Sequence, residues 1–328
     1  MSANVESMFS VREVPWHREG LVLDEYPGSW DAARALAGLD WEPITEKVYK
    51  LDGIDESGRE VYAPIAGWQN IVRSDTHATL SVATDSYTII GNGDMGEIIE
   101  AVLATPNVKY ETAGSLAGGR QVWCLALLDE PIELPGDDSV TLPYLAVTNR
   151  HDGGGAYALR ATAVRIVCAN TFRAAELEGA KTGATFSFRH TSGWRDKVDQ
   201  AREAITGARR EMRDYVELAR ELLVIPVTSV QRERFVRAFI PEPPAGLVSD
   251  RVMCNVDEAR TLLRNLFLSP TTAGVADTAY GCVQAAGEYL DHVRASRSWE
   301  TRLNRTMLRP EPLKAKALQL VRSITAES

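Results

Sequence analysis

The stretch from Asn107 to Cys168 alternates short apolar segments with glycine-rich turns, and it constrains the fold more than any other part of the chain. VKYETAGSL and RQVWCLALL are joined by AGG, a connection typical of a β-hairpin. SVTLPYLAVTN and AYALRATAVRIVC lie on either side of a polar glycine loop. Because short connections favour antiparallel neighbours, the pattern predicts an antiparallel sheet.

A short helix and another strand are predicted after this meander. Asn170 can cap the helix TFRAAELEGA, because its side-chain oxygen can accept from a backbone N–H that lacks a helical partner. TFSFRHT then resumes the alternation of a strand. We therefore expect the order β-β-β-α, followed by the strand TFSFRHT.

The strongest helical pattern follows directly. From Trp194 to Leu222, apolar residues are spaced alternately by four and three, which keeps them on one face of a helix. Ser192 is the expected cap. Such an apolar face needs a partner, either the protein's own sheet or a neighbouring subunit, and packing within the chain is the simpler expectation.

The flanking regions differ from this core. Residues 1–28 look irregular, Ser29 can cap the helix WDAARALAG, and a β-rich region then leads to a second short helix that begins at Asp94. We expect an α+β fold whose regions are an acidic, β-rich N-terminal region (1–105), a β-β-β-α core with a basic groove and a long helix (106–224), and a helical C-terminal region (225–328).

Charge is unevenly spread along the chain. The formal net charge is -9, which taken alone argues against a protein that binds nucleic acid. Residues 1–148 hold nine Lys and Arg against 24 Asp and Glu, whereas residues 149–213 hold 12 against seven. Residues 214–328 are nearly balanced, so the segment 149–213 is the clearly basic region of the chain.

The cations of this basic region are candidates for contacts with a sugar-phosphate backbone. Arginine and lysine contacts position such a backbone without reading its sequence. Solvated surface ion pairs are the alternative for most of these arginines, and the sequence leaves it open. The candidate DNA-binding residues are Arg150, His151, Arg160, Arg165, Arg173, Lys181, Arg189, His190, Arg195 and Lys197.

Motifs for enzyme chemistry are not found in the sequence. The glycine clusters lack the Gly-Lys-Ser/Thr of a phosphate loop, and neither joins a strand to a helix as in dinucleotide-binding proteins. The four cysteines are far apart, without the spacing of a zinc site. We expect no cofactor, no metal and no enzymatic activity. One alternative is a nuclease in which His151, Asp152 and His190 act in acid–base catalysis.

The N-terminal sequence and the hydropathy pattern bear on where in the cell the protein is expected. MSANVESMFSVREV has no basic segment followed by an apolar one, so no signal peptide is expected. No apolar run approaches the length of a membrane span. We therefore expect a cytoplasmic protein without a membrane partner.

The run NRHDGGGAYALRATAVRIVCANT, followed by FSFRHT and an amphipathic helix, resembles the middle of a phage/plasmid-like protein family of unknown function. The segments VPWH, DAARALAGLDWEP, ATDSYTII and YETAGSLAGGRQVW also resemble recurring blocks of that family, so the similarity spans roughly residues 8–215. More distantly, the β-β-β-α order with basic residues on the last strand and helix is similar to the core of single-strand annealing recombinases of the Red-beta, Erf, RecT and Rad types.

The more distant resemblance implies a function. It implies a ring or helical homo-oligomer that binds and anneals single-stranded DNA without nucleotide hydrolysis, in the cytoplasm of a bacterial host. A phage exonuclease or a host single-strand binding protein would be the expected partner. The acidic N-terminal half would then face away from the DNA or make subunit contacts. A third class of function, a phage protein-interaction component without DNA binding, stays open.

Overall fold

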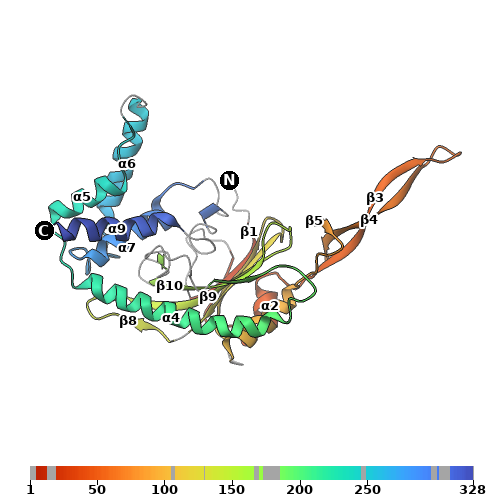
Figure 1. Cartoon of the computed structure of the whole chain (residues 1–328), viewed down its shortest axis with the longest axis horizontal. Helices are drawn as coiled ribbons and strands as arrows, with labels where there is room; N and C mark the ends of the chain where they lie inside the picture. Colours follow the sequence, from red (N-terminus) through yellow and green to blue (C-terminus); the bar gives the residue numbers. More distant parts are fainter. Residues whose placement is uncertain are drawn as a thin grey trace. The chain divides into compact units, whose positions relative to one another are not determined.

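The structure is a computed structural model of the whole chain, and two compact units make it up (Figure 1). Unit 1 comprises Met1–Leu127, Leu145–Arg160 and Thr185–Ile205, and unit 2 comprises Leu128–Tyr144, Ala161–Ala184 and Thr206–Ser328. These units interleave in sequence, whereas the three predicted regions are consecutive. The structure describes residues 5–12, 20–104, 108–128, 130–165, 170–172, 185–244, 249–296, 301–302 and 311–327.

The larger of the two sheets in the described part of the chain has the strand order β11-β10-β9-β7-β6-β1-β2, with β12 also paired to β10 and β8 to β9. The pairs β1–β6, β6–β7, β8–β9, β10–β11 and β10–β12 are antiparallel, and β1–β2 is parallel. The strands are β1 (Val5–Val11), β2 (Leu21–Leu23), β6 (Tyr110–Leu116), β7 (Gln121–Leu127), β8 (Ile132–Glu133), β9 (Val140–Arg150), β10 (Tyr157–Arg165), β11 (Asn170–Phe172) and β12 (Thr185–Phe188). Together with the helices below, this confirms the α+β class.

The N-terminal residues were wrongly expected to be irregular throughout. β1 pairs with β6, which lies about a hundred residues further along the chain, and Phe9 is fully buried in that pairing. The Thr112 hydroxyl donates to the Phe9 carbonyl at 2.6 Å, so a buried polar group is satisfied at the same place. This strand depends on a distant partner rather than on a local pattern.

The smaller sheet belongs to unit 1 and has the antiparallel order β3-β4-β5. Its strands are β3 (Pro43–Ile54), β4 (Glu60–Arg73) and β5 (Thr79–Thr84). The turn between β3 and β4 is closed by Asp55, whose Oδ1 accepts from the backbone N–H of Ser57 at 2.8 Å and of Arg59 at 2.9 Å. Such an Asx turn fixes the hairpin locally.

Two helices of unit 1 confirm the predicted short helices. In α1 (Trp30–Leu36), the Ser29 hydroxyl accepts from the Ala32 N–H at 3.2 Å, as a cap requires. The second helix, α2 (Asn92–Leu103), begins two residues before the predicted Asp94. The Trp30 indole N–H donates to the Asn92 carbonyl at 2.7 Å, which ties the start of α2 to α1.

The long helix α4 (Lys197–Leu223) begins later than predicted. Residues 191–196 form turns, in which the Trp194 N–H donates to the Thr191 carbonyl at 3.0 Å, so Ser192 is not the cap. The apolar face is confirmed where its side chains are described, because Ala201, Met212, Tyr215, Ala219 and Leu222 are all buried.

The rest of unit 2 is mainly helical, as predicted. Its elements after α4 are α5 (Ser229–Phe239), α6 (Asp250–Leu266), α7 (Ala279–Glu288), the π-helical turn η1 (Tyr289–Val293) and α9 (Pro312–Ala326). Asn170 was wrongly expected to cap a helix: Asn170–Phe172 is β11, and it pairs with Ala163–Arg165. The predicted helix residues after Phe172 lie outside the described part of the chain. Within that part, none of the helices has the length and apolar character needed to cross a bilayer.

Candidate nucleic-acid interface

Three of the candidate cations are exposed, and they lie close together in sequence within unit 1. Arg189 directly follows β12, Arg195 lies in the turn before α4, and Lys197 begins α4. Arg195 keeps 69% of its side chain exposed although its guanidinium lies 3.3 Å from the Asp94 carboxylate. We call Arg189, Arg195 and Lys197 the corner cations.

A stack of aromatic rings supports the corner cations. Trp194 is buried and stacks on Phe188 with ring centroids 6.4 Å apart, and Phe188 stacks on Tyr157 of β10 at 5.0 Å. The Arg195 guanidinium lies 4.4 Å from the centre of the Trp194 ring, within the range of a cation–π contact. Phe188 is therefore a core residue, and Phe186 is half-buried. This buried stack of rings fixes the turn that carries the corner cations.

Arg150 is held by its own loop. Its Nε donates to Asp152 Oδ1 at 2.9 Å, and the same carboxylate oxygen accepts from the Gly154 N–H at 2.9 Å. A Cβ atom at Gly155 would lie 2.7 Å from Arg150 Cδ, so a larger residue there would displace the arginine. Because this guanidinium has a carboxylate partner and only 26% of its side chain is exposed, against 69% for Arg195, we do not place Arg150 among the proposed DNA contacts.

His151 is buried rather than available to a ligand. Its Nε2 lies 3.1 Å from the Asn92 side-chain oxygen, and its ring packs edge-on against Trp41. Burial, and next the nearby His190, lower the pKa of His151 to about 3. The ring is buried and neutral near pH 7, which does not favour a contact with phosphate, and its role in DNA binding stays a prediction.

His190 is also buried, and it stacks on Tyr87 with centroids 4.8 Å apart and the planes nearly parallel. Neither ring nitrogen has a hydrogen-bond partner within the described part of the chain. Burial lowers the pKa of His190 to about 4. The structure thus brings the candidates His151, Asp152 and His190 into electrostatic reach of one another, but it seals both rings away from a DNA backbone.

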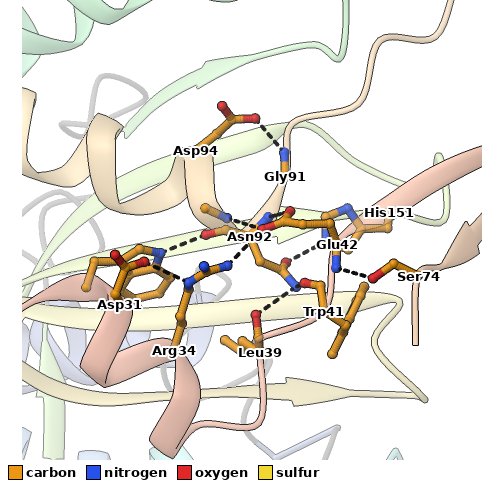
Figure 2. Close-up of polar contacts among 12 residues, drawn as sticks. Asp31, Arg34, Leu39, Trp41, Glu42, Ser74, Gly91, Asn92, Asp94 and His151 are labelled. Carbon is orange, nitrogen blue, oxygen red and sulfur yellow. Dashed lines mark hydrogen bonds and ion pairs between the residues drawn. The ribbon is translucent and has the colours of Figure 1, made fainter. Parts of the chain in front are cut away.

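The polar centre of unit 1 is Asn92, which the sequence did not single out (Figure 2). Its side-chain amide donates to the Trp41 carbonyl at 2.8 Å, while its side-chain oxygen faces His151. Asn92 therefore links the start of α2 to two segments that are distant in sequence. Asp94 marked the first turn of α2 in the sequence, and its Oδ2 accepts from the Gly91 N–H at 2.7 Å. The contact between Asn92 and His151 had no sequence signal.

Glu42 completes this network (Figure 2). Its carboxylate accepts from the backbone N–H groups of Asn92 at 2.7 Å and Gly93 at 2.9 Å, and from Arg34 Nη1 at 2.9 Å. A helix N-terminus attracts anions, and here the chain supplies its own carboxylate. The start of α2 is therefore already occupied and is not an additional phosphate site.

Of the other predicted DNA-binding residues, only Arg160 has a described side chain. Arg160 is half-exposed on β10, directly opposite Thr185 of β12. Arg165 ends β10, but its side chain is not described, and Arg173 and Lys181 lie outside the described residues. Among the side chains that the structure describes, no three His, Cys, Asp or Glu residues are grouped as a metal ion would need.

One family of known proteins matches most of the chain. The sequence model of this family, which is described as a domain of unknown function, DUF932, matches residues 79–309. No curated protein and no solved structure matches the chain. The matched range includes all of the predicted DNA-binding residues, and the family's description names no activity. The prediction that the chain belongs to a family of unknown function is therefore confirmed.

Proposed function

We propose that this chain, which belongs to the DUF932 family of unknown function, binds single-stranded DNA through its corner cations and anneals complementary strands without hydrolysing a nucleotide. The observation that carries the proposal is the exposure of Arg189, Arg195 and Lys197 within nine residues on a turn anchored by stacked aromatic rings. Exposed cations on a rigid support can neutralise phosphates at fixed positions.

Electrostatics of the corner cations support this assignment. Within the described part of the chain, Arg189 and Lys197 have no carboxylate partner, and Lys197 Nζ only donates to the Gln200 side chain at 3.4 Å. Their charges are therefore available to a phosphate, in contrast to that of Arg150. Arg160, half-exposed on the strand beside β12, is a further candidate contact.

The chemistry of annealing fits a site of this kind. Two complementary strands repel one another through their phosphates, so a protein that neutralises the backbone while leaving base edges free speeds their pairing. No bond is broken, and no catalytic group is needed. The excess of Asp and Glu in residues 1–148 disfavours a DNA-binding surface in that part of the chain. The proposal includes a homo-oligomer in the bacterial cytoplasm and a phage exonuclease or host single-strand binding protein as partner.

A nuclease is the second candidate, and one observation favours it. His151, Asp152 and His190 converge although His190 is distant in sequence. Two observations count against it: both rings are buried, and their low pKa values leave them unprotonated near neutral pH, so neither can serve as a general acid there. Incubating the protein with a labelled strand, Mg²⁺ and Mn²⁺ separates the two functions, because an annealing protein leaves the strand intact.

The direct test is a strand-annealing assay with fluorescently labelled complementary oligonucleotides. The triple variant R189A/R195A/K197A should lose most of the protein-dependent acceleration. The triple variant R220A/R234A/R237A is the matched control, because it removes the same charge from exposed positions of α4 and α5 in unit 2. If both variants anneal as fast as the wild type, or both fail equally, the corner cations are not the site.

A further inference from the structure

A two-stranded arm extends from the smaller sheet. β5 pairs with β4 only over Trp68–Val72, and Lys47 of β3 pairs with Gln69 within that range. Residues 49–54 of β3 and 60–64 of β4 therefore extend beyond β5 as a ribbon, visible in Figure 1. We call residues 49–64 the β3–β4 arm. A ribbon of two strands is at best marginally stable in water unless a face of it is covered. The side chains on its faces therefore indicate what it contacts.

One face of the arm is apolar and exposed. Directly paired residues of an antiparallel ribbon lie on the same face, and the pairs Tyr49–Pro64 and Leu51–Tyr62 put these four side chains together. A bulge between Leu51 and Gly53 shifts the register, so that Ile54 returns to this face. Their exposed fractions are 54% for Tyr49, 55% for Leu51, 69% for Ile54 and 56% for Tyr62.

The opposite face has a different character. Lys50 pairs with Ala63 there, and the Lys50 ammonium lies 3.3 Å from the Asp52 carboxylate. Val61 is the large apolar side chain on that face, opposite Gly53. The large apolar side chains of the arm are therefore concentrated on one face, whereas the opposite face carries Lys50, Ala63 and Val61.

Charges at the two ends of the apolar face have opposite signs. Lys47 lies on the side nearer the body of the sheet, and Glu60, paired with Ile54, lies on the side nearer the turn. The turn itself carries Asp55, Glu56 and Arg59. Lys47 lies four residues before Leu51, whereas Glu60 lies two residues from Tyr62, the partner of Leu51. A two-fold axis midway between the Tyr49–Pro64 and Leu51–Tyr62 pairs would therefore place Lys47 of one copy opposite the Ile54–Glu60 pair of the other, and the reverse at the other end.

We propose that the apolar face of the β3–β4 arm packs against the same face of a second copy of this chain, with the two arms antiparallel. The contact is between two identical faces, each of which has aromatic side chains near its centre. It is self-complementary in charge through Lys47 and Glu60. The acidic turn disfavours a nucleic-acid strand as occupant. This contact does not depend on nucleic-acid binding, so it is tested without it.

Sedimentation velocity on the full-length, nuclease-treated protein tests the contact. The wild type should show a monomer–dimer equilibrium. L51E puts two carboxylates beside the two-fold axis, within the apolar contact, and should weaken the dimer by about tenfold or more. V61E is the matched control, since it places the same charge on the opposite face and should leave association unchanged. Circular dichroism on each variant establishes that the fold is kept.

Charge reversal adds a test that does not depend on an apolar side chain. K47E should weaken the dimer by about two- to fivefold, and the double variant K47E/E60K should restore it. In a C254S background, which removes an exposed thiol, a short bismaleimide should crosslink L51C between copies and should not crosslink V61C, because face-to-face ribbons lie about 10 Å apart, which is too far for a disulfide. A monomeric wild type at tens of micromolar, equal effects of L51E and V61E, or equal crosslinking of both cysteine variants would overturn the proposal.

Discussion

The burial of His151 and His190 predicts that acid destabilises the protein well above the range in which carboxylates titrate. Both rings are neutral in the folded protein, with pKa values of about 3 and about 4, whereas an exposed histidine has a pKa of about 6.5. Below pH 6.5 both histidines therefore bind protons in the unfolded chain but stay neutral in the folded protein. Their contribution to the free energy of unfolding is fully present above pH 6.5 and is lost as the pH falls toward the folded pKa values.

The size of this effect follows from the same values. Between pH 7 and pH 5 each ring should remove about 2 kcal/mol from the free energy of unfolding, or about 4 kcal/mol together. The result is insensitive to the folded pKa as long as that value stays below about 4.5. The variant H190F isolates one ring, because phenylalanine keeps the stacking on Tyr87 and has no proton to gain.

Urea unfolding followed by circular dichroism and tryptophan fluorescence measures the effect. H190F should be at least as stable as the wild type at pH 7, since neither His190 ring nitrogen has a partner within the described part of the chain. It should lose about 2 kcal/mol less than the wild type between pH 7 and pH 5. An identical loss in both proteins would show that His190 is not buried in its neutral form.

Two further predictions concern the network around the glycine loop. N92A should lower the free energy of unfolding by about 2–5 kcal/mol, because it leaves the Trp41 carbonyl and the His151 ring without their buried partner; a loss below about 1 kcal/mol would contradict the network of Figure 2. R150A should keep its affinity for a single-stranded oligonucleotide within about twofold of the wild type while R189A weakens it, as measured by fluorescence anisotropy. Equal losses in R150A and R189A would place the loop in the interface after all.

Local patterns predicted the fold where neighbours in sequence decide it. Ser29 caps α1, and the hairpin of β6 and β7 follows from the AGG turn. Local patterns failed where a distant partner decides. Phe9 lies in a strand only because β6 pairs with it, and Asn170 lies in a strand because β10 offers an edge that competes with the helix cap. Residues that form strands through non-local pairing carry no signal of their own.

The candidate site shows the same division. That Arg150 pairs with Asp152 could have been predicted, because the two are separated by one residue in a tight loop. The burial of His190 could not, because it depends on Tyr87, which comes from an unrelated segment. The candidate residues of the basic stretch therefore differ in their surroundings. Arg150 is paired with a nearby carboxylate, His151 and His190 are buried, and the corner cations are exposed.

The salt dependence of single-strand binding tests the central claim most directly. Each phosphate neutralised on a single strand contributes about 0.7 to the slope of log affinity against log salt. If Arg189, Arg195 and Lys197 each contact a phosphate, the slope of R189A/R195A/K197A should be smaller than that of the wild type by about 2. The wild type should bind a labelled oligonucleotide in low salt, and the control R220A/R234A/R237A should keep its slope. Absence of binding by the wild type in low salt, or an unchanged slope in the corner variant, would contradict the assignment.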